Sequence, residues 1–374
     1  MTSGHRSTPT FNRNANRSET HHEKEKVSAL DIIEGPYLRD IFDQPRALRD
    51  TLAALESSPS LNEIVHAIKA ADYDQIVLTG MGGSYLVLYP LFLTLTKLGL
   101  PVRMAETSEL IHFMPHLINS RNLLVVVSQS GRSGEIVRLV KQQSNRPKIA
   151  AITNDATSPL AEGADIAAMI LAGAEASGAC KTTTATLLAL ALISQALATG
   201  GLATAHSLFD PLVSAVESYL GNFREHVGQL SEALRGSRHI FITGRGPSLP
   251  AAGIGGMLMK ETAHFHSEGM GSAAFRHGPF EMLRSDCFVL VFEGDAAVAP
   301  LNKSLVVDVR SAGARAQLIG PSAELSAFRL PEVHTDLRPI LEMLPLQMVS
   351  LALAALDGRE AGKFERIGKV TTEE

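Results

Sequence analysis

The chain has 374 residues, which is longer than one average domain and favours two lobes of similar size. Its hydrophobic content of 45% is enough for a large core, and its formal net charge of −5 argues against a nucleic-acid surface. The two cysteines, Cys180 and Cys287, lie far apart and form neither a disulfide nor a metal-binding pattern. We therefore expect a cytoplasmic protein in a reducing compartment, with no nucleic-acid partner.

Two segments bear on targeting and on membranes. Residues 1–28 are polar and mixed in charge, without the apolar core of a secretory signal, and are interpreted as a disordered leader. Residues 182–209 contain no Asp, Glu, Lys or Arg, so a membrane span must be considered. This second stretch is rich in Ala and Thr and is broken at Gly200 and Gly201, so a helix buried against a sheet is preferred. We expect no membrane partner.

In chain order, residues 29–52 predict an amphipathic helix interrupted near Gly35 and Pro36. A first α/β lobe follows, with a Gly-rich turn at residues 80–84 and an apolar helix at residues 85–98. Short strands that alternate with helices predict a parallel, doubly wound sheet. The expected strands of this lobe are residues 75–79, 101–105, 123–127, 148–153 and 166–171.

A helical connection over residues 183–236 leads to a second lobe with the same order of elements. Both lobes open with a strand, a Gly-rich turn and a helix, starting at Gln75 and at His239, which suggests an internal duplication. The second lobe is expected to contain strands at 239–243, 288–292 and 316–319, a turn at 244–248, a Gly/Ala-rich loop at 269–274, and helices at 251–266, 301–311 and 344–356.

The third expected strand ends in a turn rich in hydroxyl groups. The apolar residues 123–127, typical of a strand buried on both faces, are followed by Ser128, Gln129, Ser130 and Ser133 and then by a helical pattern. Serine hydroxyls and the free N–H groups of a helix start together form an anion site. The alternative is a cluster of capping residues that only starts the helix. Because the turn at 80–84 also follows a parallel strand, where ligands bind in such sheets, we favour a phosphate site.

Three further residues could take part in chemistry. Glu261 lies in a helix of small apolar residues, a setting that raises a carboxyl pKa and suits a proton-shuttling base. The alternative is a surface Glu whose charge lies in water or is paired with Lys260. His277, in a loop before Gly278, is a candidate acid or base, or a residue that only packs the loop. Lys369 near the end of the chain would ordinarily be a solvated charge.

Several motifs together resemble a known family. SQSGRSGE at 128–135, GRGPSLPAA at 244–252, KETAHFHSE at 260–268 and FRHGP at 275–279 are similar to the sugar isomerase (SIS) domains, and especially to the isomerase half of glucosamine-6-phosphate synthase. The resemblance runs from Ile41 to Lys369. It implies two tandem SIS-type lobes, each a parallel doubly wound sheet flanked by helices. The expected divisions are a leader (1–28), a first lobe (29–205), a second lobe (206–357) and a tail that enters the active site (358–374).

The resemblance also implies residue roles. The phosphate of a small-molecule sugar phosphate would be bound by Ser84, Ser128, Gln129, Ser130 and Ser133. Glu261 would shuttle a proton, His277 would open the sugar ring, and Lys369 would approach the carbonyl. In the family the histidine can reach the site from the neighbouring subunit, which implies a homodimer. This chemistry needs no metal or organic cofactor.

The sequence also departs from the synthase pattern. No glutaminase domain precedes the lobes, so we do not expect glutamine-driven amination. The synthase turn Val-Ala-Ser-Thr-Lys is replaced by Gly178-Ala179-Cys180-Lys181, and a second Glu is replaced by Ile254. Double-SIS chains of this sort resemble fructosamine-6-phosphate deglycases and amino-sugar-phosphate deaminase/isomerases, which is the activity we predict. The alternatives are a simple aldose–ketose phosphate isomerase and a regulatory module that binds sugar phosphates without converting them.

Overall fold

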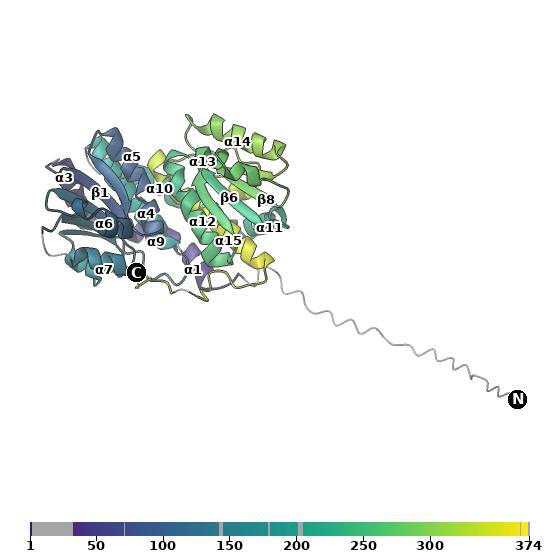
Figure 1. The fold of residues 1–374 in the computed structure, drawn as a ribbon, viewed down its shortest axis with the longest axis horizontal. Helices are drawn as coiled ribbons and strands as arrows, with labels where there is room; N and C mark the ends of the chain where they lie inside the picture. The colour runs from purple at the N-terminus through teal and green to yellow at the C-terminus, as the bar shows by residue number, and fades with distance from the viewer. Residues whose placement is uncertain are drawn as a thin grey trace.

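The computed structural model describes residue 1 and residues 33–70, 72–141, 145–178, 180–200, 205–366 and 368–372. Within these residues the chain forms two α/β lobes that lie side by side (Figure 1). The predicted leader, residues 1–28, lies outside the described residues apart from Met1.

The first lobe is built on a five-stranded sheet with all neighbours parallel, in the order β2-β1-β3-β4-β5. Its strands are β1 (Gln75–Gly80), β2 (Val102–Glu106), β3 (Asn122–Val127), β4 (Lys148–Thr153) and β5 (Ile166–Met169). Its helices are α1 (Pro36–Phe42), α2 (Gln44–Ser57), α3 (Ser60–Lys69), α4 (Gly83–Leu86), α5 (Tyr89–Lys97), α6 (Thr107–Phe113), α7 (Gly134–Val140), α8 (Pro159–Gly163) and α9 (Lys181–Thr199).

The second lobe is built on a four-stranded parallel sheet in the order β7-β6-β8-β9. Its strands are β6 (His239–Gly244), β7 (Ser267–Gly271), β8 (Cys287–Phe292) and β9 (Arg315–Ile319). The helices from the connection onward are α10 (Ala205–Gly221), α11 (Phe223–Ala233), α12 (Leu249–Ala263), α13 (Ser272–Arg276), α14 (Ala299–Ser311) and α15 (Arg338–Leu356). The predicted fold class is therefore confirmed.

Alternating side chains of the strands supply separate cores on the two faces of each sheet. In β3, Leu123 and Val125 belong to a large central core, whereas Leu124 and Val126 belong to an outer core under α6, α7 and α8. The outer face of the second sheet forms a third core with α13 and α14. The central core includes buried side chains of α9, α12 and α15 and extends through both lobes, so the lobes pack as one unit.

Among the residues that the structure describes, two helices are long and apolar enough to cross a membrane by length and composition, but both are mostly buried inside the protein. In α9 the relevant window is 78% buried, and in the helical segment Thr335–Leu356 it is 94% buried. Helix α9 packs mainly against α2 and α5, and it ends at Gly200, whose φ of 89° is left-handed. The buried-helix interpretation of this stretch and the break at Gly200 are confirmed.

Some predicted elements were wrong. The loop expected at residues 269–274 is instead the end of strand β7, which pairs with β6, and the start of α13. A Cβ atom on Gly269 would lie 1.9 Å from the Ala252 carbonyl oxygen on α12, so this glycine allows a helix to approach a strand closely and does not mark a turn. The helix expected at residues 85–98 is interrupted between α4 and α5, where Pro90 occupies the first turn of α5. In the segment 29–52, where an interruption near Gly35 and Pro36 was expected, α1 begins at Pro36, and a further break at Asp43 separates it from α2.

Candidate functional site

The serine-rich turn after β3 is folded by its own hydroxyl groups. The Gly131 N–H donates to Ser128 Oγ at 3.1 Å, and the Arg132 N–H donates to Ser130 Oγ at 3.2 Å. Gly131 has a φ of 62°, and a Cβ atom there would lie 2.2 Å from Ser158 Oγ. The turn therefore requires glycine at this position for both conformation and space.

The side chain that begins α7 is not used as a helix cap. Ser133 is the N-cap residue of α7, yet its side chain accepts no capping hydrogen bond. Within the described chain, no partner is found for the hydroxyl of Ser133, the amide of Gln129 or the hydroxyl of Ser84. These partly exposed groups can donate hydrogen bonds to an anion, so the capping alternative does not account for Ser133.

The turn that carries Ser84 lies at the same edge of the sheet as the serine-rich turn. Strands β1 and β3 are parallel neighbours, with Thr79 paired to Val126. A Cβ atom on Gly80 would lie 2.8 Å from the Val127 carbonyl oxygen and 2.9 Å from the Ser84 carbonyl oxygen. The two turns predicted to contact phosphate are therefore adjacent.

Glu261 lies in the last turn of α12 and borders a surface pocket of about 360 Å³. Burial raises the pKa of its carboxyl group; the Lys369 ammonium acts in the opposite direction, and the Glu175 carboxylate raises the pKa further. A Cβ atom on Gly178 would lie 3.7 Å from Glu261 Oε2. The carboxyl group is thus in a setting that suits a base active near neutral pH.

Lys369 is held by a carboxylate that the sequence analysis did not identify. Its Nζ donates to Glu175 Oε2 at 2.6 Å and also to the Ser177 carbonyl oxygen. The Glu175 side chain is fully buried and accepts from the N–H groups of Cys180 and Thr182 at the start of α9, at 3.1 and 3.0 Å. An acidic residue shortly before an uncapped apolar helix was the available signal, because a carboxylate there can satisfy free N–H groups.

The C-terminal tail joins this cluster to the serine-rich turn. Thr371, two residues beyond Lys369, accepts a hydrogen bond from the Gly134 N–H at 3.4 Å. Earlier in the tail, the Gly362 N–H donates to the Thr262 carbonyl oxygen at 2.8 Å, and Ser177 Oγ donates to the Gly362 carbonyl oxygen at 2.5 Å. The tail runs from the second lobe to the first and ends beside α7 (Figure 1). Two extended residues span at most about 7 Å, so the backbone of Lys369 lies near the start of α7.

The altered turn before α9 is occupied by structural contacts. Cys180 is completely buried, and burial raises the pKa of its thiol, so it is not available as a nucleophile or as a contact to solvent. Lys181 is also buried and pairs with Asp40 at 3.0 Å and Asp43 at 2.8 Å. Ala179 lies outside the described residues. Of this turn, Gly178 is the residue that faces Glu261.

His277 is not brought to the other candidates within this chain. It follows α13 on the surface, and the described residues provide no hydrogen bond or ion pair to its ring. It is also absent from the residues around the pocket beside Glu261. The structure therefore gathers Glu261, Lys369 and Glu175 near the serine-rich turn and leaves His277 free to contact another molecule.

The chain thus combines two parallel α/β lobes with a serine-rich turn and a Lys–Glu cluster. A family model for the SIS domain matches residues 70–196 and 233–356, and the chain therefore belongs to the SIS domain family. The two matched regions also confirm that the lobes are repeats of one domain. The family resemblance identified in the sequence is confirmed.

Particular relatives share this organisation. Glutamine–fructose-6-phosphate aminotransferase (isomerizing) of Thermococcus kodakarensis is 29% identical over 90% of this chain, and the chain spans 58% of that relative's length. The C-terminal domain of glucosamine-fructose-6-phosphate aminotransferase from Francisella tularensis superposes with a TM-score of 0.76 at 22% identity, covering 88% of this chain and 98% of that one. Glucosamine-6-phosphate deaminase from Thermotoga maritima gives a TM-score of 0.73 at 18% identity, with 90% and 99% covered.

Proposed function

We propose that this protein is an enzyme that converts a fructosamine 6-phosphate or an amino-sugar 6-phosphate by moving a proton between C1 and C2. The observation that carries the proposal is the tail contact: the Thr371 carbonyl oxygen accepts a hydrogen bond from Gly134 at the start of α7, directly after the serine-rich turn, while Lys369 lies in the Glu175–Glu261 cluster. A phosphate-binding turn and an acid–base cluster are thereby joined by two residues. The activities named for the relatives, an isomerizing aminotransferase and a glucosamine-6-phosphate deaminase, support the same substrate class.

In the proposed reaction, Ser84, Gln129 and Ser133 hold the phosphate from two adjacent turns. Ser128 and Ser130 shape the second turn and add oxygen atoms to it. The sugar then extends toward Lys369 and Glu261. A fixed orientation of this kind makes proton transfer effectively intramolecular.

The proposed reaction needs only the substrate, water and the side chains of the site. The Glu261 carboxylate removes a proton from C1, the electron pair forms a C1=C2 double bond, and the C2 oxygen receives a proton with assistance from the Lys369 ammonium. Return of a proton to C2 gives a protonated imine at C1; water adds to C1, a proton passes from the added water to the nitrogen, and the amine leaves as C1 becomes a carbonyl. The raised pKa of Glu261 favours the step that returns the proton.

We also propose that the protein works as a homodimer and that His277 enters the site of the neighbouring subunit, where it opens the sugar ring. Its exposed ring, without a partner in the described chain, supports this assignment. Mixing two inactive variants, Glu261→Gln and His277→Ala, tests it. Mixed dimers would regain part of the activity if the site is shared, and they would stay inactive if each chain supplied its own histidine.

The reaction is tested by offering fructose 6-phosphate, glucosamine 6-phosphate and a fructosyl-amino-acid 6-phosphate to purified protein, with products followed by NMR. Wild type is compared with Glu261→Gln and with a matched control, Glu281→Gln, whose side chain is exposed on the second lobe. Release of an amine from a nitrogen-containing substrate, lost only in Glu261→Gln, would support the proposal. Turnover of fructose 6-phosphate alone would identify a simple isomerase, and tight binding without turnover would identify a sensor.

A further inference from the structure

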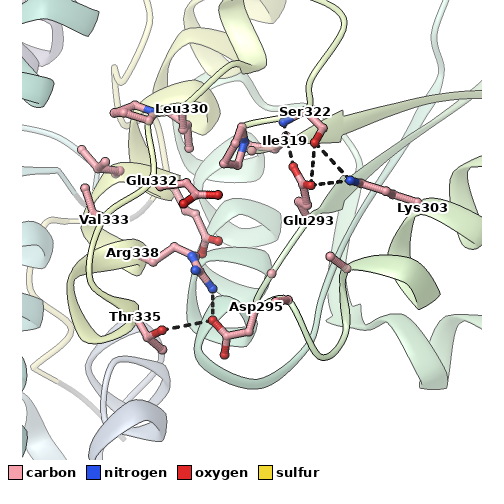
Figure 2. A pocket seen from close by; sticks show the side chains of 18 of the residues that line it. Glu293, Asp295, Lys303, Ile319, Ser322, Leu330, Glu332, Val333, Thr335 and Arg338 are labelled. Carbon is pink, nitrogen blue, oxygen red and sulfur yellow. Dashed lines mark hydrogen bonds and ion pairs between the residues drawn. The ribbon is translucent and has the colours of Figure 1, made fainter.

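The second lobe has its own cavity, away from the cluster around Glu261. It has a volume of about 670 Å³ and lies beyond the ends of β8 and β9 (Figure 2). This volume is within the usual range for sites that bind small molecules. The proposed reaction does not use any residue of this cavity.

The position of the cavity in the second lobe corresponds to the position of the serine-rich turn in the first lobe. Gly244 and Ser248 repeat the arrangement of Gly80 and Ser84: a Cβ atom on Gly244 would lie 2.8 Å from the Ser248 carbonyl oxygen. β8 lies beside β6 as β3 lies beside β1. The turn after β8, however, begins Glu293-Gly294-Asp295 in place of serines and glutamine. Carboxylates at this position disfavour a phosphate group.

Two of the acidic residues are already neutralised by partners. Glu293 accepts from Lys303 Nζ at 2.7 Å and from the N–H and hydroxyl of Ser322, each at 2.8 Å. Asp295 pairs with Arg338 and accepts from Thr335 Oγ1 at 3.2 Å. Figure 2 shows these two groups on different walls of the cavity. Each cation of the cavity is therefore matched by one carboxylate.

Two carboxyl groups remain without a cation. Glu342 is 2% exposed and lines the cavity; Ser248 Oγ donates to its Oε1 at 2.7 Å, but its Oε2 is buried with no hydrogen-bond partner. Glu332 lies on the loop above, and no ion pair or hydrogen bond is found for it in the described chain (Figure 2). A buried acceptor without a donor is costly, so a ligand that supplies a donor would be stabilised here.

We propose that this cavity is a second small-molecule site, specific for an organic amine whose ammonium group donates to Glu342 and Glu332. A metal ion is a poor alternative, because the described residues contain no group of three His, Cys, Asp or Glu side chains arranged to hold one. The ammonium group of a small amine fits the two remaining acceptors in charge and hydrogen bonding, and the hydroxyl and backbone groups nearby can accommodate polar substituents.

Calorimetric titration of the intact protein with glucosamine, and separately with glucose, tests this proposal. We expect saturable binding of glucosamine and at least tenfold weaker binding of glucose, which has no ammonium group. The isosteric variant Glu342→Gln is expected to weaken glucosamine binding at least tenfold, and the exposed variant Glu332→Gln several-fold. Glu261→Gln should bind glucosamine as wild type does, because Glu261 belongs to the other site.

The pH dependence gives an independent readout. Burial raises the pKa of Glu342 to about 7, against the opposing effects of Ser248 and Arg338. The Asp295 carboxylate raises the pKa of Glu342 further. The other charged groups of the cavity are Glu293, Lys303 and Glu332. An ammonium ligand favours the ionised carboxyl, so wild-type affinity for the ammonium form of glucosamine should rise as pH increases through about 7, and Glu342→Gln should lack this rise. Binding that is lost in Glu261→Gln but kept in folded Glu342→Gln, equal binding of glucose, or no binding at all would overturn the proposal.

Discussion

Replacing Glu175 with Gln is the sharpest test of how the tail is held, because four donors converge on its buried carboxylate. They are the N–H groups of Cys180 and Thr182, the Thr182 hydroxyl at 2.7 Å and Lys369 Nζ at 2.6 Å. Glutamine has the same shape but only one oxygen. If that oxygen still accepts from the two helix N–H groups, the new NH₂ group faces the Thr182 hydroxyl and the Lys369 ammonium. The hydroxyl can rotate to accept a hydrogen bond from it, whereas the ammonium group can only donate.

The expected loss of folding free energy follows from the lost hydrogen bond between Lys369 and Glu175. A hydrogen bond to a charged group contributes about 1.5–3 kcal/mol. Removing one partner of a buried ion pair can cost about 3–5 kcal/mol, but the Lys369 side chain is 27% exposed and can turn toward water. We therefore expect Glu175→Gln to lower the free energy of unfolding by about 2–3 kcal/mol.

Urea unfolding of Glu175→Gln, Lys369→Met and the double variant forms a double-mutant cycle. Residues in direct contact should give a coupling energy of about 1–2 kcal/mol. Glu365→Gln, an exposed carboxyl of the same tail, is the matched control and should change stability by less than about 0.5 kcal/mol. Effects of the two single variants that add within about 0.3 kcal/mol would refute the contact, and with it the position of Lys369.

Three other changes test the site and its support. Glu261→Gln should lower kcat about 10²–10⁴-fold. Because burial raises the pKa of Glu261, the wild-type kcat/KM should decline with decreasing pH at an apparent pKa above the ordinary range of glutamate. A pH profile with the apparent pKa of an ordinary carboxyl group would contradict this. Gly131→Ala should abolish calorimetric binding of glucose 6-phosphate by forcing the turn open, while unchanged affinity would show that the turn is not the phosphate site. Lys181→Met should destabilise the fold by about 3–5 kcal/mol in urea at pH 7. Hydrogen bonds from Arg46 and then Lys181 lower the pKa of Asp43, so stability from this pair is present above the ordinary pKa of aspartate and is lost as pH falls through the lowered folded-state value; an effect of the variant that does not shrink over that acid range would contradict it.

The sequence predicted what local patterns determine. Short apolar runs placed eight of the nine strands of the described chain, because β-branched residues buried on both faces leave a clear signal. Strand β7 was not predicted because Gly269 and Gly271 suggest a turn, whereas in the structure Gly269 allows α12 to pack closely against the strand. Close packing and a turn can both require glycine, so the sequence alone does not distinguish them.

The site was predicted in part. The serine-rich turn follows from one segment, and the proximity of Glu261 to Lys369 is supported by their electrostatic interaction. Glu175 could not be chosen from the sequence among the many acidic residues, because its role depends on Lys369, which is 194 residues away along the chain. The role of His277 stays a prediction, since it concerns a second copy of the chain.

The two lobes show how a duplicated backbone can carry different chemistry. The turns that end β1 and β6 keep a glycine four residues before a serine, because the helix that follows passes too close to the strand end for a side chain. At the turns that end β3 and β8, serines in one lobe correspond to Glu293 and Asp295 in the other. Under the two proposals, the side chains that select each ligand therefore belong to different turns. The acidic cavity can therefore be altered without disturbing the turn that is proposed to bind the sugar phosphate.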